Sequence, residues 1–214
     1  MTPLPFERAT LRELDGATKA LVRLSAVVTA GSDLEIRAEI VKAARDVPAV
    51  WVEELLLQSY LFAGFPRALN AAREWRRLCP VSVGSPDDRP HDVEAWRAAG
   101  VETCAAVYGS MYDKLRENIR SLHPLLDEWM VTEGYGKVLS RPGLDLPRRE
   151  LCIVAACAAA RQDRQLLSHL HGALNVGVEE TVIGEAIAAI AGLLGDDRAK
   201  SVRLLWSRVA KGEK

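Results

Sequence analysis

Apolar residues recur along this chain at spacings of three and four positions, which is the period of an amphipathic α-helix. The longest stretches with this pattern are Thr18–Thr29, Val52–Phe62, Arg148–Arg161, Gln165–Leu174 and Glu180–Leu194. These stretches are rich in Ala, Leu and Glu, which favour helix. No segment shows the sustained alternation of a strand, so the pattern predicts an all-α fold.

Helix boundaries are marked by proline and glycine. Pro147 suits the first turn of a helix, Gly177 suits a helix end, and Pro66 begins a helix that runs to Arg77. Residues 79–91 contain three prolines and two aspartates, which is typical of a linker or surface loop.

Residues 92–133 follow this loop and again carry a helical pattern. We expect breaks in this helical stretch near Gly100 and Gly109.

The chain also resembles itself. A shift of 130 positions superposes Leu14 and Asp15 on Leu144 and Asp145, Leu21 on Leu151, Ala26 on Ala156, and Ala43 on Ala173. With one further residue of slip, the string Gly-x-x-Arg-Ala followed by Trp occurs at 64–75 and again at 195–206. This similarity predicts two pseudo-repeats: a first, degenerate repeat at 1–78, a linker with connecting helices at 79–121, and a second repeat at 122–214.

The two copies differ at positions that carry chemistry. The second copy has Glu150 and His169 where the first has Ala20 and Glu39. Shared positions in a duplication are more often packing positions, so the differences indicate where function lies. The second copy is therefore the predicted site.

Composition narrows the class of partner. The chain has 214 residues, a hydrophobic content of 49% and a net charge of −1. The near-zero charge gives no reason to expect nucleic acid or an anionic membrane surface as a partner. Residues 1–14 lack the apolar core of a signal peptide, and no apolar run is long enough to span a membrane, so we expect a cytoplasmic protein.

The four cysteines, Cys79, Cys104, Cys152 and Cys157, are scattered, with no CxxC and no zinc-finger spacing. We expect buried free thiols, and neither a metal nor a cofactor.

The polar residues of the second copy have a specific spacing. The string Arg148-Arg149-Glu150-Leu151 is followed by Gln165, His169 and a Gly172-Ala173-Leu174 run. This string resembles the carboxymuconolactone decarboxylase family, which includes the alkylhydroperoxidase D branch. The resemblance extends to Glu53–Gln58 with Ala63–Pro66, and to Glu133–Lys137 with Ser140–Gly143.

In the peroxidase branch, the glutamate is followed after twelve residues by a CxxC and then by a histidine. Glu150 and His169 match that signature, whereas the two cysteine positions are Gln162 and Gln165. Glutamine has no sulfur to oxidise, so a thiol peroxidase mechanism is disfavoured.

The resemblance implies two units of the alkylhydroperoxidase-like helical fold in one body. It also implies a homo-oligomeric ring, for example a trimer of double repeats. The aliphatic faces of Val52–Phe62 and Ile183–Leu194 are alternatives for the subunit interface or for core.

The surviving glutamate and histidine suit proton transfer without a cofactor, by decarboxylation or isomerisation of a small carboxylated lactone-like substrate. We expect His169 to be the proton donor and Glu150 to be the carboxylate that orients it and favours its charged form. Helical spacing places Gln162, Gln165 and His169 on one face. We expect Gln162 and Gln165 to bind the substrate through their side-chain amides. Arg141, Arg148 or Arg149 is expected to bind a carboxylate of the substrate, and Tyr135 to line the pocket wall.

Two alternatives remain beside this enzyme hypothesis. The first is a non-catalytic oligomeric protein that binds a ligand at a decayed peroxidase site. The second, which is less favoured, is a peroxidase that uses displaced cysteines.

Overall fold

The computed structural model describes residues 10–81, 87 and 92–212. Its helices are α1 (Gly16–Ala30), α2 (Asp33–Asp46), α3 (Ala49–Gln58), α4 (Tyr60–Ala63), α5 (Phe65–Leu78), α6 (Val93–Tyr108), η1 (Gly109–Met111), α7 (Tyr112–Leu122), α8 (Pro124–Trp129), η2 (Met130–Leu139), α9 (Leu146–Ala159), α10 (Asp163–Asn175), α11 (Glu180–Leu194) and α12 (Asp196–Ala210). Over these described residues the chain forms no strand, apart from one isolated bridge between Leu11 and Val178. The predicted all-α fold is confirmed. Most of the predicted loop at 79–91 lies outside the described residues.

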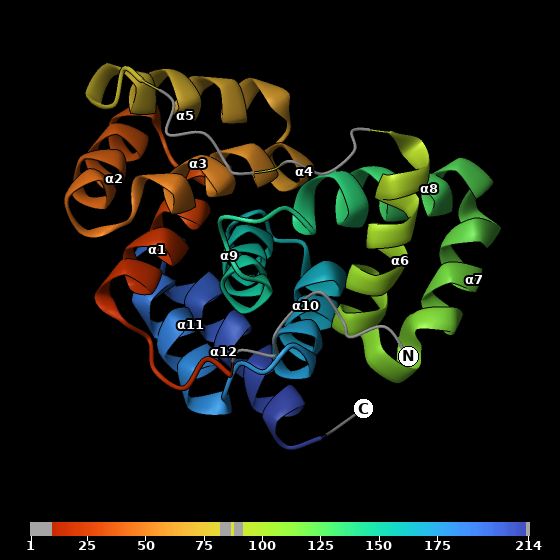
Figure 1. Ribbon diagram of the computed structural model, residues 1–214. Coiled ribbons are helices and arrows are strands. Elements are labelled where there is room, and N and C mark those ends of the chain that lie inside the picture. Colours follow the sequence, from red (N-terminus) through yellow and green to blue (C-terminus); the bar gives the residue numbers. More distant parts are fainter. Residues whose placement is uncertain (1–9, 82–86, 88–91, 213–214) are drawn as a thin grey trace.

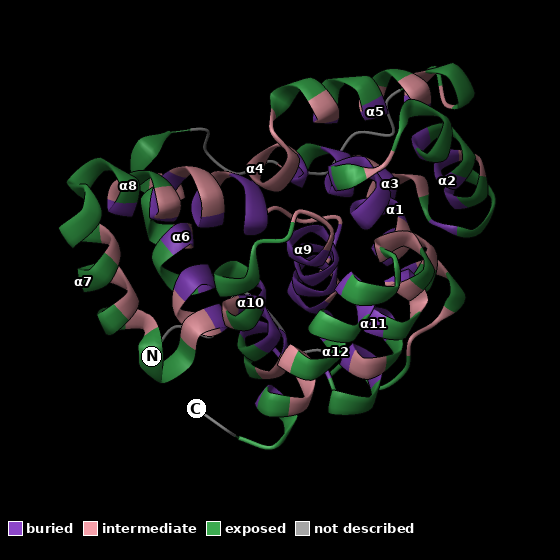
Figure 2. Ribbon diagram, turned by 180° about the vertical axis from the view of Figure 1, so that it is seen from behind, coloured by how far each residue is buried: buried purple, intermediate pink, exposed green. Residues whose placement is uncertain are grey.

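Helix α9 occupies the centre of the molecule. It packs against α1, α10 and α11, so that neighbours surround it on several sides (Figure 1). Twelve of its fourteen residues are buried, and the helix is almost entirely purple in Figure 2. A helix that is buried around most of its circumference can hold a polar side chain in a dry environment, provided that the side chain has a partner.

The two halves of the chain form similar local structures. Asp15 begins α1 by accepting a hydrogen bond from the Thr18 amide, and Asp145 begins α9 by accepting one from the Arg148 amide. Asp and Ser are preferred at this position because their side-chain oxygens satisfy an otherwise unpaired amide of the first turn.

A second correspondence lies before the last helix of each half. Gly64 (φ 79°, ψ 158°) precedes α5 and Gly195 (φ 77°, ψ 158°) precedes α12. Both glycines therefore adopt the same positive-φ conformation, which L side chains rarely accept.

The arginines of the shared Gly-x-x-Arg-Ala string also correspond. The Nε of Arg67 donates to the Val28 carbonyl and the Nε of Arg198 to the Ala158 carbonyl, each at 2.7 Å. Since residue 158 is residue 28 shifted by 130, these bonds support the duplication, which stays an interpretation.

Helix α6 and the π-helical segment η2 lie in close contact. A Cβ atom at Gly100 would overlap the Val131 carbonyl oxygen, and one at Gly136 would overlap the Trp96 carbonyl. The predicted break near Gly100 is therefore wrong, because this glycine lies inside α6 and permits close packing. The chain does break at Gly109, where φ is +52°.

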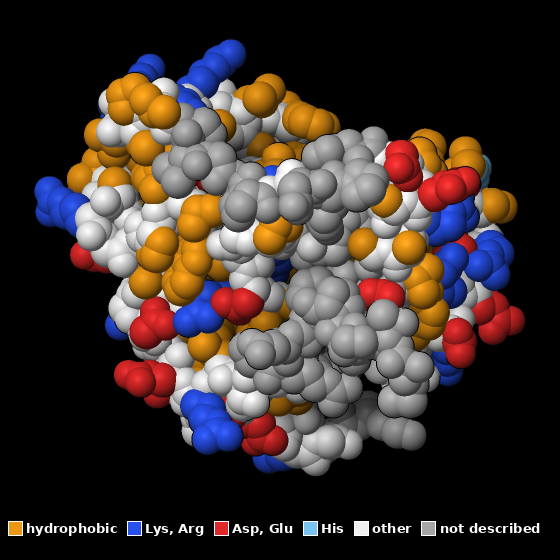
Figure 3. Space-filling view, in the orientation of Figure 1, with side chains coloured by type: hydrophobic (Ala, Val, Ile, Leu, Met, Phe, Trp, Pro, Cys, Tyr) orange, Lys and Arg blue, Asp and Glu red, His pale blue; other side chains and the backbone are white. Residues whose placement is uncertain are grey.

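The two aliphatic faces that were considered for a subunit interface are mainly core in the single chain. Ile183, Ile187 and Ile190 of α11 are buried, as are Val52 and Leu55 of α3. Exposed hydrophobic side chains gather instead on α5, at the upper left of Figure 3, where they include Phe65, Leu69 and Leu78. The ring assembly remains a prediction.

None of the helices in the described part of the chain is both long and apolar enough to cross a membrane.

Candidate active site

Glu150 and His169 meet at the interface of α9 and α10. The Nδ1 atom of His169 lies 2.8 Å from Oε2 of Glu150. Both side chains are buried, with 5% of His169 and 0% of Glu150 exposed to solvent. In so dry an environment this hydrogen bond holds the imidazole in one orientation.

The short turn between α9 and α10 makes this meeting possible. Arg161 adopts a positive φ of 58°, and α10 begins two residues later at Asp163. The two helices therefore run antiparallel as a hairpin, in which residue 150 lies opposite residue 169.

Gly172, one turn beyond His169, leaves space for the glutamate. A Cβ atom at this position would lie 2.8 Å from Glu150 Oε2 and 2.7 Å from Val107 Cγ1. The carboxylate thus fits only because residue 172 has no side chain.

His169 lines a cavity of about 420 Å³, which is large enough for a small molecule. Its lining is mainly aromatic and aliphatic and consists of Leu61, Phe62, Tyr108, Leu115, Ile119, Leu126, Trp129, Met130, Glu133, Gly134, Tyr135, Leu139, Gln165, Ser168 and His169. Helices α4, α6, α7, α8, α10 and the segment η2 all contribute. The cavity is therefore assembled from all three predicted segments of the chain.

One ring nitrogen of His169 remains available to a ligand. Nδ1 is engaged by Glu150, and among the described residues no hydrogen bond to Nε2 is present. Phe62 packs edge-on against the imidazole with a centroid separation of 5.9 Å, which fixes the ring from one side. A buried, oriented imidazole with one available nitrogen at a cavity can move a proton.

Two tyrosines lie in the same wall. Tyr108 of α6 has its ring centroid 5.9 Å from that of Tyr135 and 6.3 Å from that of His169. The hydroxyl groups of the two phenols interact with each other. Burial raises the pKa of both phenols, so each keeps its proton at neutral pH.

The two glutamines expected at the site are placed differently. Gln165 lines the cavity beside His169. Gln162 precedes the first turn of α10, is exposed, and is not part of the cavity lining. Only Gln165 is in position to offer its amide to a ligand there.

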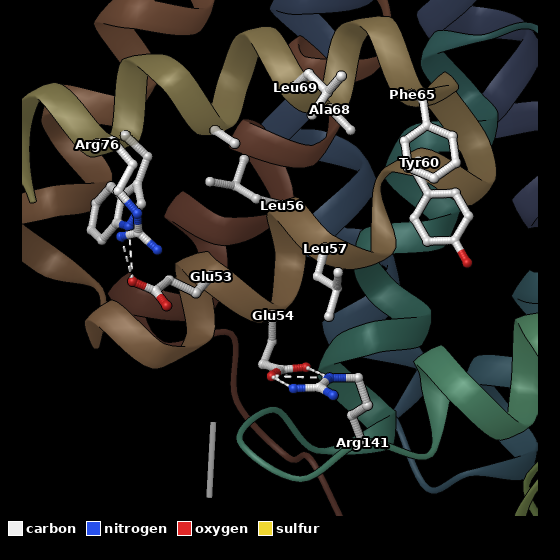
Figure 4. Close-up of a pocket in the computed structure, with 12 residues that line it drawn as sticks. Glu53, Glu54, Leu56, Leu57, Tyr60, Phe65, Ala68, Leu69, Arg76 and Arg141 are labelled. Carbon is white, nitrogen blue, oxygen red and sulfur yellow. Dashed lines mark hydrogen bonds and ion pairs between the residues drawn. The ribbon is translucent and has the colours of Figure 1, made fainter. Parts of the chain in front are cut away.

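Arg141 and Arg149 lie outside this cavity and converge on Glu54. Nη2 of the fully buried Arg149 is 2.8 Å from Glu54 Oε2, and Nη2 of Arg141 is 3.0 Å from Glu54 Oε1. Figure 4 shows the Glu54–Arg141 pair at the edge of a second cavity between α3 and α5. The structure thus gives these arginines a carboxylate partner within the chain, and they are not placed to hold a substrate carboxylate beside His169.

Arg148 is also engaged within the fold. It forms ion pairs with Asp15 at 2.9 Å and with Asp145 at 2.6 Å, and so joins the starts of α1 and α9.

None of the four cysteines lines the His169 cavity. Cys104, Cys152 and Cys157 are buried, and burial raises the pKa of Cys104 and of Cys157 to about 12. A thiol with so high a pKa is a poor nucleophile at neutral pH. In the described part of the chain, no cluster of His, Cys, Asp and Glu has the arrangement of a metal site.

Sequence reasoning missed Tyr108 and the cover formed by α7 and α8. The strongly amphipathic pattern of α7, with Leu115 and Ile119 one turn apart, was the available signal.

The fold and the paired Glu and His define a helical protein with a buried acid/base pair at a small-molecule cavity. Comparison with known proteins then finds a family whose model matches part of the chain. Residues 124–207, which include both Glu150 and His169, match the model of the carboxymuconolactone decarboxylase family. This match confirms, over that region, the resemblance predicted from the sequence.

A relative in Schizosaccharomyces pombe (strain 972 / ATCC 24843), described as "Peroxisomal protein 2", is 27% identical over 143 residues. The match covers 63% of this chain and 64% of the relative, so the chain spans slightly less than two thirds of that protein.

Proposed function

We propose that this protein is a cofactor-free enzyme that moves a proton on a small unsaturated lactone or a related carbonyl compound. The observation that carries the proposal is the buried 2.8 Å contact between Glu150 and His169 at the wall of the 420 Å³ cavity. The match of residues 124–207 to the carboxymuconolactone decarboxylase family supports it.

In an isomerisation, Nε2 of neutral His169 removes a proton from the carbon next to the carbonyl group. The electrons of the broken C–H bond move into the carbonyl oxygen and form a dienolate. The imidazolium, held in place by the Glu150 carboxylate, then returns the proton to the distal carbon of the dienolate. No electron is lost or gained in this sequence.

In a decarboxylation, the electrons come from a broken C–CO₂⁻ bond, CO₂ leaves, and imidazolium protonates carbon. That reaction needs a group that binds the substrate carboxylate. Of the three arginines expected to do so, Arg141 and Arg149 pair with Glu54. Arg148 pairs with Asp15 and Asp145, so the contacts favour isomerisation over decarboxylation.

The test is proton exchange and isomerisation followed by NMR in D₂O. The substrates are γ-carboxymuconolactone and the uncharged α-angelica lactone, each with wild type and His169→Gln. We expect wild type to convert at least one lactone and His169→Gln to lose about 100-fold or more of that rate. The thermal midpoint of the variant, measured by circular dichroism, checks that it is folded.

Glu39→Gln is the matched control, because Glu39 occupies the position in the first half that corresponds to His169. It should leave the rate unchanged. Full activity in His169→Gln, or an equal loss in both variants, would overturn the proposal.

A binding protein without catalysis is the second candidate function, and the mainly apolar lining of the cavity favours it. Saturable binding of the lactones by wild type without exchange or turnover would support that candidate. A peroxidase that uses displaced cysteines is disfavoured, since no cysteine lines the cavity. Location in the cytoplasm stays a prediction, and the name of the yeast relative makes a peroxisomal location the alternative to test.

A further inference from the structure

The charged side chains described at the wall of the His169 cavity are carboxylates. Among the described residues that line it there is no lysine or arginine, whereas Glu133 lies in the wall and the Glu150 carboxylate lies directly behind His169. Glu133 is already engaged, by the Tyr60 hydroxyl at 2.6 Å and by Lys137 at 3.3 Å. An anionic ligand would therefore enter a mainly apolar space whose described lining offers it carboxylates and no cation.

The hydrogen-bond donor of this wall is a tyrosine. The hydroxyl groups of Tyr108 and Tyr135 interact with each other. A contact between two phenols engages at most one of their two protons, so one proton of the pair is left for a ligand. Among the described residues no acceptor for that proton is present, and Tyr108 lines the cavity with its ring centroid 6.3 Å from that of His169. A ligand oxygen in the cavity can accept this proton while a ligand carbon approaches the imidazole.

We propose that the cavity takes an uncharged, mainly apolar carbonyl compound, and that Tyr108 donates a hydrogen bond to the carbonyl oxygen, with Tyr135 positioning Tyr108. The proposal rests on the proposed function for its reaction, but its binding claim stands separately. It assigns to Tyr108 the oxyanion-stabilising role that the sequence suggested for Gln162 and Gln165. Tyr108 lies outside residues 124–207, so the family match does not supply this residue.

The geometry also explains why two tyrosines are present. A phenol that accepts a hydrogen bond polarises its own O–H group and becomes a better donor. As negative charge develops on the ligand oxygen, both bonds strengthen, and stabilisation of that charge is the usual way in which such donors accelerate a reaction.

The experiment measures binding with two probes of nearly equal size, acetophenone, which is neutral, and benzoate, which is anionic. We expect wild type to bind acetophenone and to bind benzoate at least tenfold more weakly. Isotope-edited infrared spectroscopy of ¹³C=O acetophenone should show the carbonyl stretch shifted to lower frequency in the complex. The opposite preference, for benzoate, would overturn the proposal.

Tyr108→Phe removes only the hydroxyl group. It should weaken acetophenone binding by about tenfold, which corresponds to one net hydrogen bond, and abolish the carbonyl shift. Tyr135→Phe should leave part of the shift, because this residue acts through Tyr108. A carbonyl shift that is unchanged in Tyr108→Phe would overturn the assignment.

His169→Gln separates the two proposals. It should keep acetophenone binding and the carbonyl shift, since it removes only the proton carrier. If wild type shows the Tyr108-dependent shift but turns over neither lactone, the ligand class stands and the proposed function fails. If the lactones turn over at the same rate in wild type and Tyr108→Phe, the proposed function stands and the role of Tyr108 is wrong.

Discussion

The α9–α10 pair of the second half and the α1–α2 pair of the first half hold different groups at corresponding positions. In the second half, Glu150 pairs with His169 above a cavity. In the first half, residue 20 is an alanine and Glu39 occupies the histidine position. Glu39 forms ion pairs with Arg23 and Lys42, each of which has a nitrogen 2.8 Å from Oε1 of Glu39.

The two halves differ in whether a polar group at this position remains available to a ligand. Arg23 also donates from Nη1 to the Ala189 carbonyl at 2.7 Å, so each charged group of this cluster has a partner in the first half or in α11. In the second half, residue 153, the counterpart of Arg23, is a buried isoleucine, and His169 keeps a ring nitrogen for the cavity. The same helix arrangement thus supports an ion-pair cluster in one half and a candidate site in the other.

Substitution of Gly172 gives the largest expected effect on the site of the second half. This glycine leaves space for Glu150, whereas its counterpart in the first half is Lys42. Gly172→Ala places a methyl group 2.8 Å from Glu150 Oε2, so the carboxylate must move. We expect about 100-fold loss of lactone turnover, since small displacements at a reacting centre are costly. Overpacking should also destabilise the fold by about 1–3 kcal/mol. Rate assays and urea unfolding measure the two effects.

The control for that variant is Gly192→Ala in α11, where a Cβ atom would meet nothing within 4 Å. This change should leave turnover intact and stabilise the fold by about 0.5–1 kcal/mol through helix propensity. Wild-type turnover in Gly172→Ala would show that the precise position of Glu150 is unimportant.

The ion-pair cluster of the first half gives a smaller, pH-dependent effect. Burial opposes ionisation of Glu39, but the hydrogen bonds from Arg23 and Lys42 outweigh it and lower the pKa of this carboxyl. A lowered folded-state pKa contributes stability above the ordinary pKa of glutamate, and that stability is lost as the pH falls through the folded-state value. Glu39→Gln should therefore cost about 1 kcal/mol at neutral pH.

The difference in unfolding free energy between Glu39→Gln and wild type should shrink on acidification below the ordinary glutamate pKa. Urea denaturation across the acidic range measures it. A difference that grows in acid would contradict the assigned ion pairs.

Much of the fold and half of the site follow from the sequence. The helical period predicted the all-α class, and Asp145 with Pro147 marked the start of α9. The spacing of Glu150 and His169 placed them opposite each other in a hairpin. The partners of Arg141 and Arg149 did not follow, because Glu54 is 87 and 95 residues away and charge alone does not specify which carboxylate an arginine meets.

The remaining lining of the cavity could not be predicted from the sequence for a similar reason. Tyr108, Phe62 and Trp129 come from separate helices, and a local pattern does not show which helices close over one another. The π-helical segment η2, which carries Tyr135, was also absent from the prediction. Helix α6 approaches this segment closely at Gly136, and such a tertiary contact does not show in a local sequence pattern.

The central claim is that Glu150 holds the imidazole of His169 so that its other nitrogen faces the ligand. Heteronuclear NMR of the ¹⁵N-labelled histidine side chains measures this directly in wild type and Glu150→Gln. We predict that Nδ1 of His169 carries a proton shared with Glu150, and that only the Nε2 resonance moves when lactone is added. A His169 whose Nδ1 is unprotonated in wild type, or whose Nε2 resonance ignores ligand, would contradict the account.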